Sequence, residues 1–284
     1  MSFLRNFVVI STILSVNAAA ALACTPRDFV DLPLPAPERP AAVQALLLAY
    51  PDLALSDDGA SVVTSAGAAV PLGTIRDIGA AARLTSATLA EQFLQAYPLD
   101  FDLDARSAPF FDPGRLRNDA FFRALWFDSE GAARASLTRV TMPGTQSVFQ
   151  VTQARGVDCQ LTAALDLIHR TQPDAARYFA GAGGGFNWRT IAGTRRLSAH
   201  SFGISVDINP EIGQYWRWTG AREGAVGAYT NKVPESLVAA MERFGFIWGG
   251  KWHHFDGMHF EYRPELILHA RLAGPAMPSP GGSQ

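Results

Sequence analysis

Apolar and polar residues alternate in two short segments in the second half of the chain. In residues 204–208, isoleucine and valine alternate with polar residues that include Asp207. In residues 258–262, Met, Phe and Tyr alternate with His259 and Glu261. A period of two is typical of a β-strand with one buried face. We therefore expect two neighbouring strands that present Asp207 and His259 on one sheet surface.

Apolar residues at helical spacing predict several helices, and Pro or Gly marks where some of them begin or end. The predicted helices cover residues 40–50, 84–97, 157–172, 234–244 and 264–272, with a short helix or extended piece at 118–126. Strands are predicted at 135–142 and 147–152, and a small hairpin within 50–73. The Gly run 181–185 is too loose for a phosphate-binding loop and predicts a flexible lead into a strand at 186–189. The pattern predicts an α+β fold, in which a small antiparallel sheet carries the site and helices pack on its other face.

Histidine and acidic residues gather around the two alternating segments. His200 precedes Asp207 by seven residues, and a bend at Gly203 could fold the imidazole back over the carboxylate. A hydrolytic zinc ion takes three ligands from His, Asp or Glu and keeps one position for water. His200, Asp207 and His259 fit that count. Asp256, three residues before His259, could take a proton from the water without binding the metal.

Each of these residues, taken singly, also has a purely structural interpretation. A lone His or Asp on a strand is more often a hydrogen-bonded structural group than a metal ligand, but the combined pattern is hard to explain as packing. His253 and His254 are competing ligands; they lie nearer the Gly-Gly turn, and we expect them to line the pocket or to support the ligands by hydrogen bonds. His169 and His269 fall in predicted helices and are expected to be structural or exposed.

At these residues the chain resembles a known family, the zinc D-alanyl-D-alanine carboxypeptidases. The resemblance lies in two motifs, Ser198-x-His200-x-x-Gly203-x-x-x-Asp207 and Asp256-x-x-His259. The family includes dipeptidases and L-alanyl-D-glutamate endopeptidases, and the Trp248-Gly-Gly turn is most similar to the endopeptidase branch. One departure is Ser205, where relatives often have Ala. The resemblance covers residues 184–262 and extends weakly upstream to residues 112–117.

The resemblance implies a fold, ligands, a base and a substrate. It implies a Hedgehog-like and D-alanyl-D-alanine peptidase-like fold, Zn²⁺ held by the three ligands named above, Asp256 as general base, and peptidoglycan stem peptides as substrate. It also implies a substrate-binding arginine upstream of the first histidine. Arg189 is the best match, with Arg195 and Arg196 as alternatives. We expect Ser198 and His254 to contact substrate as well.

Residues 210–233 form a long connection that is crowded with aromatic residues, among them Tyr215, Trp216 and Trp218. A loop of that length in a compact domain is usually functional, so these rings, Trp216 in particular, could wall a groove for a peptide or glycan. Alternatively, these aromatic rings simply cover the hydrophobic core, which explains their positions equally well. Arg115 and Arg117 could contact an anionic substrate, although surface pairing with nearby aspartates is the commoner situation.

Residues 1–23 have the pattern of a secretory signal, with a basic flank at Arg5, an apolar run and a small-x-small cleavage site. Cleavage would leave Cys24 at the mature N-terminus, where it could be acylated or could form a disulfide with Cys159, the only other cysteine. We rank the lipid anchor second, because Ala rather than Leu stands three residues before Cys24. Either alternative places the protein in the periplasm or outside the cell.

The chain of 284 residues has 24 basic and 26 acidic residues, a formal charge of −2. Removing the signal removes one arginine and no acid, which leaves about −3. No basic run or basic–aromatic pattern suggests nucleic acid, and the apolar run of the signal is too short to stay as a membrane span. We expect a monomer with four parts: a signal at 1–23, an N-terminal segment at 24–73, a peptidase domain at 74–272 and a disordered tail at 273–284.

The predicted function is an exported zinc peptidase acting on peptidoglycan stem peptides. Two other classes are compatible with the sequence. One is a binding module with a structural zinc that recognises wall peptides without cutting them; the presence of Asp256 argues against it, because such a site needs no base. The other is a zinc hydrolase acting on a free dipeptide or a small amide. The sequence does not separate a carboxypeptidase from an endopeptidase.

Overall fold

The structure, a computed structural model, describes residues 25–191 and 194–274. The predicted signal, Cys24 and most of the predicted tail therefore lie outside the described residues. The helices are α1 (Ala41–Ala49), α2 (Ala80–Ser86), α3 (Asp119–Leu125), α4 (Glu130–Ala135), α5 (Val157–Thr171), α6 (Ala176–Phe179), α7 (Glu235–Arg243) and α8 (Pro264–Ala273). The strands are β1 (Ala54–Leu55), β2 (Ser61–Val63), β3 (Ala69–Pro71), β4 (Leu137–Thr141), β5 (Val148–Thr152), β6 (Ser205–Asp207), β7 (Phe246–Trp248) and β8 (His259–Tyr262).

The central sheet has the order β6-β8-β7, and both pairings are antiparallel. The register places Asp207 opposite His259, as the alternation predicted. The apolar residues of β6 and its flanks are buried. All four residues of β8 are also buried, so the polar side chains of β8, His259 and Glu261, face the interior rather than solvent. The α+β fold, with small antiparallel sheets and packed helices, is confirmed.

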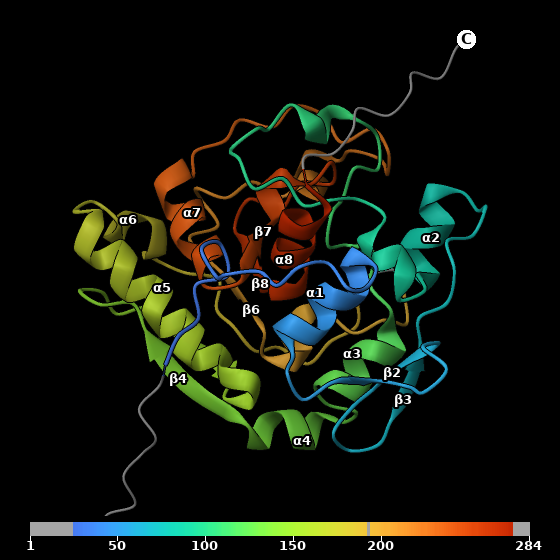
Figure 1. The fold of residues 1–284 in the computed structure, drawn as a ribbon. Helices are drawn as coiled ribbons and strands as arrows, with labels where there is room; N and C mark the ends of the chain where they lie inside the picture. The colour runs from blue at the N-terminus through green and yellow to red at the C-terminus, as the bar shows by residue number, and fades with distance from the viewer. Residues whose placement is uncertain (1–24, 192–193, 275–284) are drawn as a thin grey trace, which may run out of the picture.

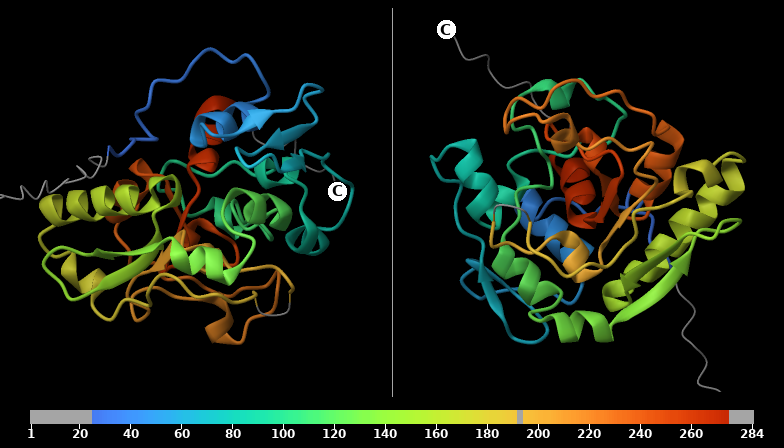
Figure 2. Two further views of the ribbon diagram at one scale, coloured as in Figure 1. Left: turned by 90° about the horizontal axis from the view of Figure 1, so that it is seen from below. Right: turned by 180° about the vertical axis from the view of Figure 1, so that it is seen from behind.

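Helices cover one side of this sheet. Helix α8 follows β8 directly, contacts β7, and packs against α1 from the N-terminal part of the chain. Seen from below, α1 and α8 lie on one side of the molecule, and the gold-to-orange segments that carry His200 and Asp207 lie on the other (Figures 1 and 2). This arrangement leaves one face of the central sheet for the site.

The N-terminal segment shares the main hydrophobic core rather than forming one of its own. Leu46 and Tyr50 at α1 are buried in the same cluster as Leu266 and Phe246. The predicted hairpin is present as the three antiparallel strands β1, β2 and β3. Cys159, on α5, is disulfide-bonded, which agrees with the disulfide alternative for the cysteines.

A two-stranded sheet of β4 and β5 lies beside the central sheet, and α5 packs on it. The backbone N–H of Thr152 donates to the carbonyl of Gly203, which joins the end of β5 to the bend before β6. In Figure 1, β4 and the neighbouring helix α5 form one flank of the molecule. The two sheets therefore meet at the segment that carries His200.

Two predicted elements differ in the structure. The helix predicted at 84–97 is wrong: α2 ends at Ser86, and a short 3-10 turn follows at Ala90–Phe93. Thr88 and Glu91 explain the break, because the hydroxyl of Thr88 accepts from the Glu91 N–H and the Glu91 carboxylate accepts from the Thr88 N–H. This reciprocal pair starts a new turn and ends the previous helix.

The Gly run at 181–185 also differs from the prediction. Gly184 pairs with Asp207 of β6, and the segment at 186–189 forms no strand of its own. A Cβ atom on Gly185 would lie 2.3 Å from the carbonyl oxygen of Gln150, so a larger residue would push this segment away from β5. The glycines allow close backbone approach at the edge of the sheet instead of providing a flexible lead.

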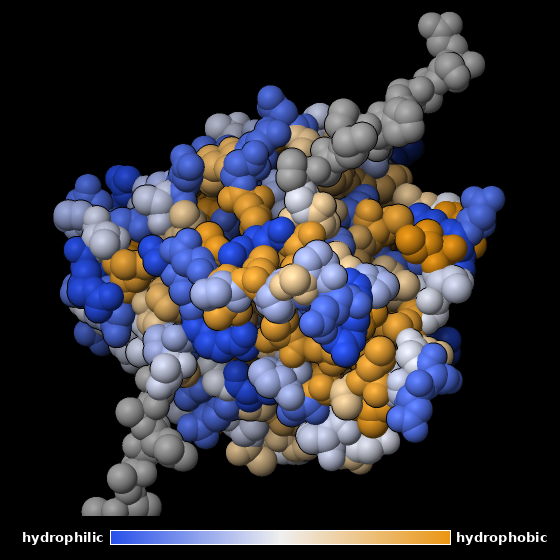
Figure 3. All heavy atoms as spheres, viewed as in Figure 1, coloured by the Kyte–Doolittle hydropathy of each residue, from blue (hydrophilic) through white to orange (hydrophobic). Residues whose placement is uncertain are grey.

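The face over α1 and α8 shows hydrophilic and hydrophobic residues interspersed (Figure 3). Within residues 25–191 and 194–274, no helix combines the length and the hydrophobicity that crossing a membrane requires.

Candidate metal centre

Three segments bring the predicted ligands together. His200 lies in a short 3-10 turn, Ala199–Phe202, which ends at Gly203 with a φ of 67°. That left-handed conformation favours glycine, and it turns the chain directly into β6. Asp207 ends β6, and His259 begins β8 opposite it. The predicted bend and the predicted strand pairing together place the three side chains at one point.

Their ligand atoms face one another at short range. His259 Nδ1 lies 3.0 Å from Asp207 Oδ1, and His200 Nε2 lies 3.2 Å from each of these atoms. Ligands of a tetrahedral zinc ion, at about 2.0–2.2 Å from the metal, stand about 3.4 Å apart, close to this spacing. Together, His200, Asp207 and His259 form a group that could hold a metal ion, called the metal group below.

The other nitrogen of each imidazole is held by an oxygen atom that can only accept a hydrogen bond. His200 Nδ1 donates to the carbonyl of Gly185 at 2.6 Å, and His259 Nε2 donates to Glu261 Oε2 at 3.4 Å. The carbonyl of Gly185 fixes the proton of His200 on Nδ1 and leaves the lone pair of Nε2 facing the cluster, whereas His259 has a carboxylate beside each of its ring nitrogens. Once Nδ1 of His259 is deprotonated, the cluster presents three lone-pair atoms to one another, an arrangement that suits a cation between them.

The pKa shifts in the cluster show the same demand for positive charge. Burial alone would raise the pKa of Asp207, but His200 and His259 outweigh it and hold that pKa well below its usual range. Burial lowers the pKa of His259, yet the hydrogen bonds with Asp207 and Glu261 raise it to about 10. A proton thus takes the place of the cation when no metal is bound, and metal binding must displace it.

Glu261 is a site residue that the sequence analysis did not single out. Its carboxylate contacts His259 on one side and pairs with Arg263 at 3.2 Å and Arg117 at 3.5 Å on the other. Arg263 also pairs with Glu265, which accepts a hydrogen bond from Tyr50. Although burial raises the pKa of Glu261, Arg117 is the largest of several influences that hold it well below its usual range. The negative charge of Glu261 therefore stays in place to orient His259.

Replacing Glu261 by Gln is expected to lower the affinity for metal by about 10- to 100-fold, because the outer partner of His259 loses its charge. Calorimetric titration of the metal-free protein with Zn²⁺ measures this. Glu265→Gln is the matched control, since it removes the other carboxylate beside Arg263 without touching His259. An equal loss of affinity in both variants would mean that general destabilisation, not orientation of His259, causes the effect.

Asp256 lies beside the cluster and does not join it. Its backbone carbonyl accepts from the His259 N–H at 3.1 Å, and its side chain lines the same cavity as the three ligands. Its Oδ1 atom is buried and has no hydrogen-bond partner in the described part of the chain. Burial is the main cause that raises the pKa of this carboxyl to about 6. A carboxylate with a free oxygen next to a metal group is suited to move a proton.

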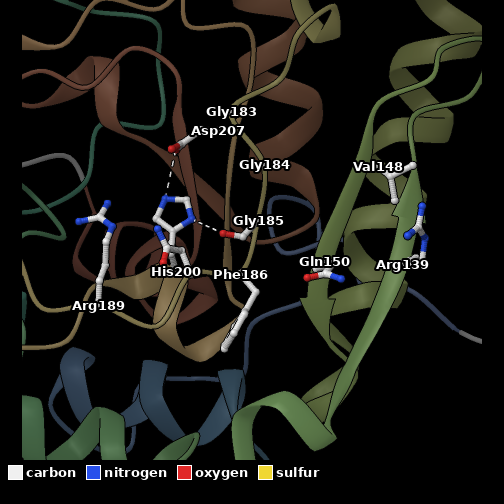
Figure 4. Close-up of a pocket in the computed structure, with 11 residues that line it drawn as sticks. Arg139, Val148, Gln150, Gly183, Gly184, Gly185, Phe186, Arg189, His200 and Asp207 are labelled. Carbon is white, nitrogen blue, oxygen red and sulfur yellow. Dashed lines mark hydrogen bonds and ion pairs between the residues drawn. The ribbon is translucent and has the colours of Figure 1, made fainter. Parts of the chain in front are cut away.

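Two hollows meet at the cluster. One is a groove bordered by the Gly183–Gly185 backbone, Gln150 and Arg139, and it reaches His200 and Asp207 (Figure 4). The other continues on the side of Asp256 and Tyr215, and four arginines line it, Arg115, Arg117, Arg189 and Arg196. Arg189 borders both hollows, and Figure 4 places it on the side of His200 away from Gln150 and Arg139. A peptide that occupied both hollows would have the middle of its backbone beside the metal group and Arg189.

The candidate substrate-binding residues differ in position. Ser198 and Arg189 line the cavity, while Arg195 is exposed at the surface. His254 is buried, with Nδ1 on Asp112 at 2.7 Å and Nε2 accepting from the Gly224 N–H at 2.9 Å. This pairing attaches the 210–233 loop to the body of the molecule.

The remaining pocket candidates are three aromatic residues of this loop and His253. Trp216 is buried against His254, whereas Tyr215 reaches the cavity and Trp218 is exposed. His253 Nδ1 bonds to the carbonyl of Arg106 at 3.0 Å, away from the three ligand atoms. The structure thus keeps His253 outside the metal group.

The fold and the cluster define an α+β protein with a His-Asp-His group, buried at both histidines and half-buried at the aspartate, that could hold a metal ion. The family model described as D-alanyl-D-alanine carboxypeptidase matches residues 192–262. This segment contains the three candidate ligands and Asp256, and the match confirms the family resemblance inferred from the sequence. Comparisons with curated proteins and with solved structures gave no match.

Proposed function

We propose that the protein is an exported, zinc-dependent peptidase that hydrolyses peptidoglycan stem peptides. The observation that carries this proposal is the convergence of three potential ligand atoms, 3.0–3.2 Å apart, beside the Asp256 carboxylate, whose Oδ1 atom has no hydrogen-bond partner among the described residues. The family match supplies the reaction class and the kind of substrate. Export to the periplasm or the cell exterior rests on the signal pattern at 1–23, with a lipid anchor at Cys24 as the alternative.

Different residues of the site carry out metal binding and proton transfer during hydrolysis. Zinc, when bound by His200, Asp207 and His259, supplies a Lewis acid that polarises a carbonyl and makes water more acidic. Asp256 takes the proton from the attacking water and passes it to the leaving amine. A buried carboxylate with a raised pKa holds that proton better than an exposed one.

In this proposal, Arg189 binds the scissile carbonyl. It borders both hollows, and it forms no ion pair with an acidic residue in the described part of the chain. A guanidinium in that position stabilises the negative charge that develops on the carbonyl oxygen. Ser198, on the same cavity wall, is a second candidate for contact with the substrate.

Incubation of the mature chain with defined stem peptides tests the proposal. Cleavage is expected with Zn²⁺, loss of cleavage with a chelator, and recovery when Zn²⁺ is returned. Mass spectrometry of the products separates release of D-Ala from a cut between L-Ala and D-Glu. A metal-loaded chain that binds these peptides without cutting them would refute the peptidase and indicate a wall-binding module.

A further inference from the structure

The cavity beside Asp256 has more positive charge than its own acidic residues balance. Arg117 pairs with Glu261, but Arg115, Arg189 and Arg196 form no ion pair with any acidic residue that the structure describes. The remaining acids of the cavity are Asp256 and Asp207, and Asp207 already belongs to the metal group. A bound metal ion would add further positive charge. The cavity is therefore suited to an anionic group.

Two of these arginines are held in place before any ligand arrives. Arg115 Nη1 donates to the carbonyl of His254 at 2.8 Å, and its guanidinium lies 5.8 Å from the ring centre of Trp252. Arg196 Nη1 donates to the carbonyl of Arg117 at 3.3 Å, while its Nε is buried without a hydrogen-bond partner among the described residues. Fixed guanidinium groups with unused donors are a favourable site for a carboxylate.

The crowding of these charges can be seen at Arg196. Burial, together with the neighbouring Arg117 and Arg115, lowers the pKa of Arg196 to about 9. The protein itself supplies too few acidic groups near Arg196 to offset this repulsion. A ligand carboxylate would relieve it.

The position of this cavity fixes which part of a substrate enters it. Asp256, the group that gives its proton to the leaving amine, lines this cavity and not the groove along Gly183–Gly185. The leaving half of the substrate thus belongs beside Arg115 and Arg196, and the half that keeps the carbonyl belongs in the groove. In the terminal amino acid of a peptide, the nitrogen that becomes the leaving amine and the free carboxylate are bonded to the same carbon atom. A terminal carboxylate therefore lies close to the leaving amine.

We propose that Arg115 and Arg196 bind the free C-terminal carboxylate of the substrate, so that the enzyme removes a single terminal amino acid. This inference rests on the proposed peptidase function and narrows it to a carboxypeptidase. It assigns a role to the Asp112–Arg117 turn, which lies outside the matched family segment. Arg115 and Arg196 select the substrate, while Arg189 and Asp256 act at the bond that is cut.

A pair of peptides tests the proposal. Both end in D-Ala-D-Ala, one with a free carboxylate and one with a C-terminal amide. The wild-type chain is expected to cleave the free acid at least about tenfold more efficiently, since an ionised hydrogen-bond partner is lost in the amide. Arg115→Met and Arg196→Met should each lower kcat/KM for the free acid by about 10- to 100-fold and leave that for the amide nearly unchanged. Arg195→Met, an exposed neighbour of Arg196, should change neither rate.

A binding measurement keeps the proposal testable without turnover. The metal-free wild-type chain, titrated with the two peptides in a calorimeter, should bind the free acid more tightly, and Arg115→Met should remove this difference. Equal binding of acid and amide would overturn the carboxylate site. An internal cut between L-Ala and D-Glu, insensitive to the terminal carboxylate, would also overturn it and leave the zinc peptidase intact. Preference in binding without any cleavage would keep the carboxylate site and refute the peptidase.

Discussion

Replacing His259 by alanine is expected to remove metal binding and peptidase activity together. The variant keeps only two of the three ligands, and it leaves Asp207 and Glu261 without the imidazole that lies between them. A catalytic zinc site needs three protein ligands, so the metal content should fall from one ion per chain to near zero after dialysis. Activity on stem peptides should fall by more than about 1,000-fold, because the Lewis acid that polarises the carbonyl and acidifies the water is lost.

Metal analysis and a peptide assay on the same preparation measure both effects. His169→Ala is the matched control, because His169 is an exposed histidine at the end of α5 and lies far from the ligands in sequence. It should keep the metal and the rate. Full metal occupancy in His259→Ala would exclude this cluster as the metal site.

Replacing Asp256 by asparagine is expected to separate metal binding from catalysis. Asparagine has the same shape but cannot take a proton, and the three ligand atoms are untouched. The affinity for Zn²⁺ should stay within a few-fold of the wild type, while kcat falls by about 100- to 10,000-fold. Asp256→Glu should recover part of the rate, because the carboxylate returns in a longer side chain.

Steady-state kinetics beside a zinc titration of each variant make this comparison. Asp57→Asn, at an exposed turn in the N-terminal segment, controls for the general effect of losing a carboxylate. Wild-type turnover in Asp256→Asn would show that Asp256 is not the base. Loss of zinc in that variant would mean that Asp256 contributes to holding the metal.

The sequence predicted the centre of the fold because its local pattern and its long-range pairing agree. Alternation on both strands buries apolar residues on one side, and only one register then places Asp207 opposite His259. The helices were predicted where apolar spacing and a terminal Pro or Gly coincide, as in α7 and α8. The helix predicted at 84–97 failed because the exchange of hydrogen bonds between Thr88 and Glu91 overrides the apolar spacing.

The surroundings of the metal group could not be predicted in the same way. Glu261 falls on the polar face of its strand, and nothing local shows that Arg117 and Arg263 hold its charge. Arg115 looked like a surface residue near acidic neighbours; its place in the cavity depends on contacts with Trp252 and with His254, which follows 139 residues later. Such contacts follow from the folded topology, which a linear pattern of residues does not contain.

Several residues that orient the ligand side chains, directly or through Glu261, lie outside the segment that the family model matches. His200 depends on the carbonyl of Gly185, and Glu261 depends on Arg117 and Arg263, all outside residues 192–262. The chain of contacts ends at Tyr50, directly after α1. A fragment cut at the borders of the matched segment would carry the three ligands but not the groups that orient them. The smallest transplantable unit is therefore close to the whole described chain, and grafting the motifs alone onto another scaffold would not transfer a working centre.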